Sequence, residues 1–499
     1  MPLYRTASFD RGAFEVFRDS LAQDRSLPLS EAIDDELFAE AFERHGVDFG
    51  NTPDAVYTPA ITLWALVSQA LFSGVHRSCG AAVTRVSLLW AARGRRIVST
   101  NNGDYCRARQ KIPSEAVRDI ATGLADRAET GAVRDAQIDA AGGHDEGCFA
   151  VPHVAATDAF VPEGRTLLID GFTVDCSDTE ANQNAWPQNP SQKEGLGQPI
   201  VRCLALISLA TGLLVDLAVG PYSGKETGET ALFRQLLAVL RPGDLLVADR
   251  YLCTYFIIAA CQLIGVEVVM RKHHKRKDDP AMTFVYDDSE RQTYWVRPER
   301  PEWMSEEEYR RMPERLAIRM VDVEDRRSGF RTTKLTIVTT IMDRSNVTAH
   351  WVRSMYRCRW TVELDIRDIK QTLGAEYLRA KSPAMVLTEL WSILLAYNLI
   401  RMTMLQSGSA VDRAARSMGF AMTVQTLGAS WTTLAIAGVD VVVAGAVQKS
   451  SRGETVADRP GRYEPRANKR RSKMIALLVE PRSLHHARHA AAVAAATAA

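Results

Sequence analysis

Four residues in the second half of the chain have types and spacing suited to metal and phosphate chemistry. Tyr356, Arg359, Glu363 and Lys370 stand at relative positions 0, 3, 7 and 14. At about 100° per residue on a helix, these positions fall near about 0°, 300°, 340° and 320°, so the four side chains share one face. A carboxylate flanked by two cations and a phenol suits a metal ion that meets a phosphate backbone.

The same segment carries an apolar stripe beside this polar face. Val362, Ile366, Ile369 and Leu373 follow the i, i+4, i+7, i+11 spacing of a helix that packs on a core. We therefore expect the polar face to lie next to buried structure, which would hold it rigidly.

Two more carboxylates lie at the ends of predicted strands. Asp170 ends the strand in Arg165–Val174, and Asp249 ends the strand in Asp244–Arg250. Ligand sites in open α/β sheets lie at such strand ends. A two-metal site needs converging carboxylates, and Mg²⁺ prefers oxygen ligands. Each residue alone has an ordinary alternative: an aspartate at a strand end is usually a turn residue, and a helix glutamate usually faces solvent.

Neighbouring acids compete for the same roles. The alternatives are Asp175, Asp178, Asp365 and Asp368. Order along the chain and the spacing around Glu363 favour Asp170, Asp249 and Glu363 over them.

Elements must bring these residues together. From 165 to 270 the sequence predicts the order β-β-β-α-β-α-β, which gives a mixed sheet with helices on its faces. Residues 272–335 interrupt this alternation, and Ala384–Met404 reads as a long packed helix.

Residues 1–150 are predicted to be helical. Within them, 101–111 offers a turn followed by a basic stretch, and a helix starts at Ser114. This order is compatible with a helix-turn-helix DNA reader, but this segment alone favours an all-α packing domain that has a basic surface.

Bulk properties are those of a globular protein. The chain has 499 residues, 46% hydrophobic and 24% charged, with a net charge of +1. Basic runs at Arg271–Lys277 and Lys449–Lys473 can contact phosphates or form a solvated loop and tail. The eight cysteines form no C-x-x-C pair, and we expect no signal peptide and no membrane span.

With these motifs on view, the chain resembles DDE transposases of the bacterial IS-four-type insertion-sequence superfamily over roughly residues 60–473. The most specific match is the YREK signature at Tyr356, Arg359, Glu363 and Lys370. Asp170-Gly-Phe-Thr-Val and Ala248-Asp249-Arg250-Tyr match the segments of the first and second acids. The family's core has a ribonuclease-H-like fold.

The resemblance implies cut-and-paste DNA transposition. Asp170, Asp249 and Glu363 would be catalytic and would hold two Mg²⁺ or Mn²⁺ ions, while Tyr356, Arg359, Lys370 and Arg250 would contact DNA. A hairpin intermediate and an aromatic residue that stacks on a flipped base belong to the same picture. Trp295 and Trp303 are candidates for that stacking, although we favour core packing for both.

The implied partners are double-stranded DNA, as terminal inverted repeats and target, and a second copy of the chain on that DNA. The implied location is cytoplasmic, at the bacterial nucleoid. The expected fold class is α/β, a ribonuclease-H-like core with a β-rich insertion, preceded by an all-α domain. The expected divisions are a helical DNA-binding domain (1–150), the first part of the core (151–271), the insertion (272–335), the rest of the core (336–405), a helical and basic region (406–473), and a disordered Ala-rich tail (474–499).

Three alternatives remain open. A ribonuclease-H-like nuclease would cut without strand transfer. A transposase-derived DNA-binding protein would be catalytically silent. A helical interaction protein would carry the signature by chance.

Overall fold

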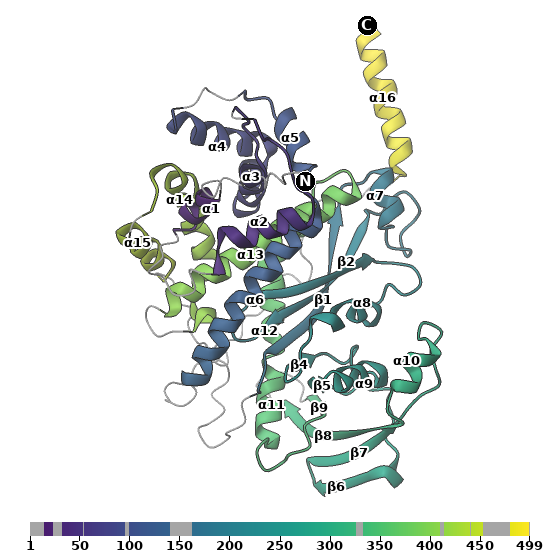
Figure 1. Cartoon of the computed structure of the whole chain (residues 1–499). Helices are drawn as coiled ribbons and strands as arrows, with labels where there is room; N and C mark the ends of the chain where they lie inside the picture. The colour runs from purple at the N-terminus through teal and green to yellow at the C-terminus, as the bar shows by residue number, and fades with distance from the viewer. Residues whose placement is uncertain are drawn as a thin grey trace, which may run out of the picture.

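The computed structural model is built around one mixed β-sheet with helices on both faces (Figure 1). It describes residues 14–22, 32–52, 54–94, 99–139, 162–325, 333–409, 414–439, 441–452 and 480–498. The strands of the sheet are β1 (Thr166–Cys176), β2 (Ile200–Ser208), β3 (Leu214–Pro221), β4 (Leu245–Ala248), β5 (Glu267–Arg271), β6 (Thr283–Asp287), β7 (Glu290–Val296), β8 (Arg315–Asp325), β9 (Thr333–Thr339) and β10 (Tyr377–Leu378).

The order of the first five strands defines the fold. β1, β2 and β3 pair antiparallel, and β4 and β5 continue the sheet on the other side of β1, in parallel. The resulting order, β3-β2-β1-β4-β5, is the ribonuclease-H-like arrangement predicted from the sequence. The parallel step from β4 to β5 runs through α9 (Tyr255–Leu263), because parallel neighbours need a crossover.

Side-chain alternation along β1 separates two cores. Leu167 and Ile169 belong to the core under α8 (Glu229–Leu236) and α9. Leu168 belongs to the larger core on the opposite face, which contains α6 (Ser114–Asp139), α12 (Trp360–Arg367) and α13 (Pro383–Ser409). The two faces of the sheet are thus covered by different parts of the chain.

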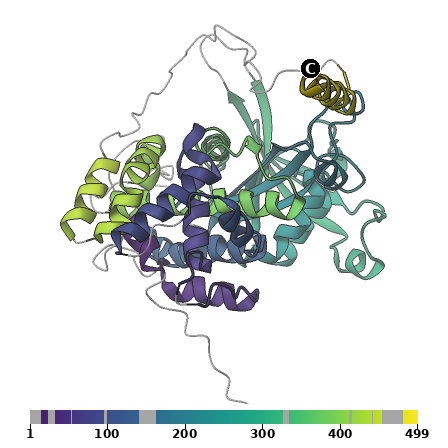
Figure 2. The ribbon, with the colours of Figure 1, turned by 90° about the horizontal axis from the view of Figure 1, so that it is seen from above.

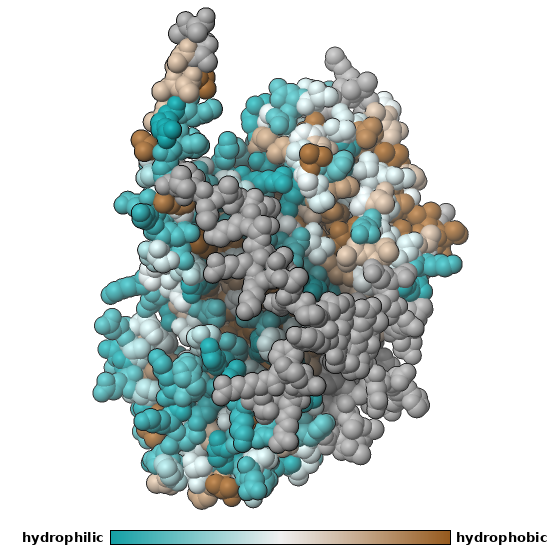
Figure 3. Space-filling model, turned by 180° about the vertical axis from the view of Figure 1, so that it is seen from behind, coloured by the Kyte–Doolittle hydropathy of each residue, from teal (hydrophilic) through white to brown (hydrophobic). Residues whose placement is uncertain are grey.

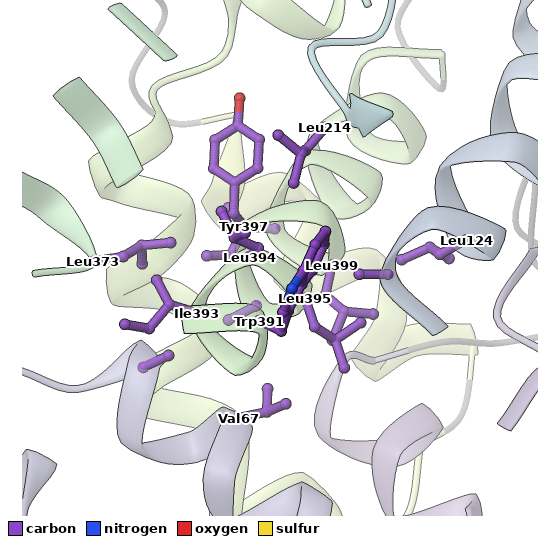
Figure 4. Close-up of a cluster of buried hydrophobic side chains, with 14 of the residues drawn as sticks. Val67, Leu124, Leu214, Leu373, Trp391, Ile393, Leu394, Leu395, Tyr397 and Leu399 are labelled. Carbon is purple, nitrogen blue, oxygen red and sulfur yellow. The ribbon is translucent and has the colours of Figure 1, made fainter. Parts of the chain in front are cut away.

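The larger core joins helices from both ends of the chain, which gather on one side of the sheet in Figure 2. The helices before the sheet are α1 (Glu15–Ser20), α2 (Asp35–Arg44), α3 (Pro59–Leu71), α4 (Cys79–Ala92), α5 (Gly103–Arg109) and α6, and those after α13 are α14 (Phe420–Ala437) and α15 (Val441–Ser451). Figure 4 shows Leu394 and Tyr397 of α13 in one cluster with Val67 of α3 and Leu214 of β3, with Tyr397 beside Leu214.

α13 is the centre of that core. Among the described residues it is the one helix long and apolar enough to cross a membrane, and 78% of its most apolar window is buried inside the protein. Asn398 ties it to its neighbours: Nδ2 donates to the carbonyls of Ala121 and Leu214, and Oδ1 accepts from the Leu214 N–H at 2.8 Å.

The insertion extends the sheet rather than standing apart from it. β8 pairs with β9, which pairs with β5, so β6, β7 and β8 continue the central sheet. The surface over the insertion is mostly hydrophilic in Figure 3, although Phe284 and Val285 of β6 are exposed, as are Val441 and Val442 of α15. Trp295 is 3% exposed with the Arg276 guanidinium 4.0 Å from its ring centre, which confirms the preference for core packing.

Three local predictions were wrong. β1 does not end at Asp170 but runs on to Cys176, because its antiparallel partner β2 continues alongside. The tail after 474 was expected to lack order, yet Arg482–Ala498 forms an exposed helix, α16, since alanine has the highest helix propensity.

The third concerns the helix that carries the signature, which is not one regular helix. α11 (Ala349–Arg357) and α12 are separated by a tight turn at Cys358, and the turn after α12 is a π-helix, Asp368–Thr372. Backbone bonds from Arg359 to Tyr356 and from Thr361 to Cys358 tighten the first turn. A constant rotation of about 100° per residue therefore does not describe the whole segment from Tyr356 to Lys370, because the turns before and after α12 differ from α-helical geometry.

Candidate active site

Asp170 and Asp249 come from two neighbouring strands at the centre of the sheet. β1 and β4 pair in parallel, and Leu168 opposite Val247 is their last pair. Asp170 lies two residues after Leu168, and Asp249 lies two residues after Val247. The two aspartates are therefore at the same level of the sheet, with Asp249 just beyond the end of β4. Side chains two residues apart share a face, so both carboxylates start on the side of Leu168 and Val247, which is the side of α12.

Glu363 reaches the same region from α12. The helix packs against β1 through a buried face that includes Val362 and Ile366. Arg359, at the N-cap of α12, links two of the acids: its Nη2 donates to Glu363 Oε1 at 2.7 Å, and its Nη1 lies 3.7 Å from Asp170 Oδ2. The guanidinium therefore stands between the first and the third acid.

Burial and charge act together on this group. Burial raises the pKa of Asp170 to about 6; Arg359 and the Gly171 N–H oppose the rise, and the charges of Asp249 and Glu363 add to it. Burial is the largest single influence on the pKa of Arg359 and lowers it, but the hydrogen bond to Glu363 and the charges of Tyr356, Glu363 and Asp170 together outweigh burial, so this pKa is raised. The charges of Asp249 and Glu363 thus act on Asp170, and Arg359 offsets part of that negative charge.

Tyr356 lies on α11, one turn before Arg359. It is 8% exposed, and burial raises its pKa, with Arg359 and Arg271 opposing the rise and Asp249 adding to it. The phenol therefore lies within the electrostatic reach of the second acid and keeps its proton at neutral pH.

Lys370 and Arg250 lie at the edges of this group. Lys370 is half-buried in the π-turn. Burial raises the pKa of the Cys203 thiol to about 12, and the nearby charge of Lys370 opposes this rise. Arg250 lies over the Tyr251 ring at 5.0 Å and donates to its hydroxyl. Asp249 holds the same loop, because its Oδ1 accepts from the Tyr251 N–H at 2.7 Å.

The donor set fits a divalent metal by its chemistry. Among the described residues, no three His, Cys, Asp or Glu side chains are grouped closely enough to hold a metal ion as they stand. However, the carboxylates are hard oxygen donors of the kind that Mg²⁺ and Mn²⁺ prefer. Arg359 already places positive charge between Asp170 and Glu363. Charge and donor type are thus suited to cations at this position.

The opposite side of α12 is fixed by a buried ionic network. Asp365 is 1% exposed and accepts from Arg401 Nη2 at 2.6 Å and from Arg416 Nη1 at 2.9 Å. Arg401 also lies 3.5 Å from Asp368, and Arg416 donates to the Leu209 carbonyl after β2. Asp365 and Asp368, which compete with Glu363 in the sequence, therefore serve to hold the helix.

Sequence reasoning missed a fourth acid near the site. Glu229 begins α8, and burial raises its pKa, with the charges of Asp249 and then Asp170 adding to the rise. No motif marks this residue. The one available signal was the glycine directly after Asp170, in the middle of a strand, where glycine often marks a close approach.

The other predicted DNA-contacting segments are partly engaged within the protein. In α5, Arg107 is exposed beside Asp104, while Arg109 packs over the Tyr105 ring. In the 271–277 run, Lys275 and Lys277 are exposed, but Lys272 pairs with Asp278 and Arg276 covers Trp295. Trp303 is 38% exposed under the Arg234 guanidinium, so the core packing predicted for this residue is wrong. The basic run at 449–473 lies outside the described residues from 453 onward.

Comparisons with known proteins found similarity to transposases. Residues 162–399 match the family model described as "Transposase DDE domain". A segment of 72 residues is 39% identical to transposase InsG for insertion sequence element IS4 of Escherichia coli (strain K12); it covers 14% of this chain and 16% of that relative. A solved piggyBac transposase synaptic complex with hairpin DNA has 10% identity and a TM-score of 0.42, with 91% of this chain and 88% of that chain covered.

The matched span starts just before β1 and ends within α13, so it contains Asp170, Asp249 and Glu363 together with the strands and the helix that position them. Residues 162–399 of this chain, which carry the whole candidate site, are therefore similar to the transposase DDE domain.

Proposed function

We propose that the chain catalyses DNA transposition by metal-dependent strand cleavage and strand transfer, with Asp170, Asp249 and Glu363 as ligands of two Mg²⁺ or Mn²⁺ ions. Such ions, when bound, polarise a scissile phosphate, activate the attacking hydroxyl and stabilise the leaving oxygen. One observation carries the proposal: the register of β1 and β4 aligns the two aspartates, and Arg359 links Asp170 to Glu363.

The residues around the acids are suited to hold DNA. Tyr356 keeps its proton and can donate a hydrogen bond to a phosphate oxygen. Arg359 places a guanidinium beside Asp170 and Glu363, and such a group can also donate to phosphate oxygens. Lys370 and Arg250 add positive charge at either edge.

The DNA itself is the element's terminal inverted repeats and then the target. We assign recognition of the repeats to the helical region 1–150, where Arg107 of α5 is exposed, and further phosphate contacts to Lys275 and Lys277. Because two element ends must be cut and joined together, the working assembly is a dimer on DNA.

An excision assay tests the proposal. The substrate is a plasmid with a marker between the DNA sequences that flank the gene for this chain. Asp170→Asn, Asp249→Asn and Glu363→Gln should each abolish excision while end binding in a gel-shift assay persists. Normal excision by any of the three would sink the assignment. Nicked DNA without joined product from the unaltered chain would point to the nuclease alternative.

A further inference from the structure

Glu229 stands out among the carboxylates that the proposed mechanism does not use. It is half-buried at the first position of α8, on the face of the sheet opposite to α12. An acid in the first turn of a helix is common, because the helix dipole favours it, and such residues ordinarily face solvent. Glu229 instead lies against the backbone of β1.

The contact with Gly171 fixes the position of this side chain. A Cβ atom at position 171 would lie 2.7 Å from Glu229 Cδ and 3.1 Å from Glu229 Cγ, closer than side chains approach. The φ angle of Gly171 is not positive, so the backbone does not require glycine there. Glycine weakens a strand interior and often marks a close approach. At this position the group that approaches is the carboxyl group of Glu229, next to Asp170.

The sheet is open at this point. On one flank of β1, pairing with β4 ends at Leu168 and pairing with β10 begins at Asp175, among the described residues. A side chain from the α8 face can therefore reach the space beyond the end of β4. The charges of Asp170 and Asp249 both act on Glu229 there.

α8 holds Glu229 in place from behind. Leu232, Phe233 and Leu236 are buried in the core between the helix and the sheet, and a Cβ at Gly220 of β3 would lie 2.9 Å from Leu232 Cδ2. The helix therefore cannot shift without repacking that core, and the first residue of the helix stays over Gly171.

We infer that Glu229 is a fourth carboxylate of the proposed metal site and contributes to divalent-cation binding together with Asp170 and Asp249. The inference rests on the proposed function, because it adds a ligand to that site. The four carboxylates come from β1, the residue after β4, α8 and α12. They would therefore approach a bound cation from both faces of the sheet.

Mn²⁺ binding to the full-length chain tests this, followed by the electron paramagnetic resonance signal of free Mn²⁺. Glu229→Gln should weaken Mn²⁺ affinity by about tenfold or more. Glu226→Gln is the matched control, because Glu226 lies in the same segment but is exposed and pairs with Arg234. The Mn²⁺ affinity of this variant should equal that of the wild type. Circular dichroism checks that each variant is folded.

The outcomes separate this inference from the function on which it rests. Wild-type affinity in Glu229→Gln, with binding lost in Asp170→Asn, would overturn the role of Glu229 and leave the proposed function standing. Equal Mn²⁺ binding by the wild type and Asp170→Asn would overturn both.

Discussion

Glu363 and Asp365 are two residues apart on α12 and have opposite surroundings. The Glu363 side chain is 41% exposed and has one arginine partner, Arg359. The Asp365 side chain is 1% exposed and accepts from two arginines, Arg401 and Arg416, which come from distant parts of the chain. The difference teaches that a carboxylate in a charged segment serves the fold when its arginines are buried around it, and is available for ligands when its side chain stays open.

The two sides of the helix depend on each other. Glu363 is placed beside Asp170 only while Asp365 keeps α12 in its orientation on the sheet. A network that buries charge so completely is costly to break, because the partner left behind remains buried without compensation. Stability and function can therefore be separated by substitutions two residues apart.

The largest effect that sharpens this comparison is on stability. Asp365→Ala should lower the free energy of unfolding by about 3–5 kcal/mol, because Arg401 and Arg416 would stay buried while they share only the charge of Asp368. Urea denaturation followed by circular dichroism measures it. Glu363→Ala is the control on the same helix and should lower stability less, because Glu363 is open to solvent and Arg359 keeps Asp170 as a partner. Equal losses in both variants would break the distinction.

A second effect concerns pH in the metal-free protein. Asp170 has a pKa of about 6 in the folded state against 3.8 ordinarily, so the folded state binds the proton more tightly. Stability should therefore fall as pH rises from about 4 to about 6, by at most about 3 kcal/mol from this group. Urea denaturation in chelator across that range checks it.

Asp170→Asn provides the comparison for the pH series. The variant has no titrating carboxyl group at this position, so its stability should change less over the same pH range and should exceed that of the wild type near neutral pH. Parallel pH profiles for the two proteins would show that the environment of Asp170 is not as described.

The smallest effect is expected at the edge of the site. Lys370→Ala should lower the yield of joined product by about tenfold, the equivalent of about 1.4 kcal/mol, because a phosphate contact is lost and the carboxylates are kept. Gel analysis of cleaved and joined DNA measures it, with exposed Lys381→Ala as the control. Unchanged joining by Lys370→Ala would remove this residue from the proposed DNA contacts.

Much of the fold could be predicted because its signals are local. The order of strands and helices, the hairpin between β2 and β3, and the carboxylates near strand ends all follow from short patterns. The position of Asp249 directly after β4 agrees with that reasoning. The sequence also predicts Asp170 at the level of the sheet where β4 ends. The structure has it at that level, although β1 itself continues to Cys176.

Other features could not be read from local patterns. The pairing of Asp365 with Arg401 and Arg416 joins residues that are far apart in sequence, and no periodicity connects them. The approach of Glu229 to Gly171 depends on how α8 packs across β2 and β3. The tight turn at Cys358 has no glycine or proline to mark it, and both residues of the turn have near-helical backbone angles.

The most direct test of the central claim is metal dependence at Glu363 itself. Glu363→Cys replaces a hard oxygen donor by a softer sulfur donor, which disfavours Mg²⁺ relative to Mn²⁺. The measurement is strand cleavage of element-end DNA in each metal, with the wild type in parallel. The account predicts that the variant is inactive in Mg²⁺ and regains cleavage in Mn²⁺. Cleavage at the wild-type rate in Mg²⁺ would contradict a role for Glu363 as a metal ligand.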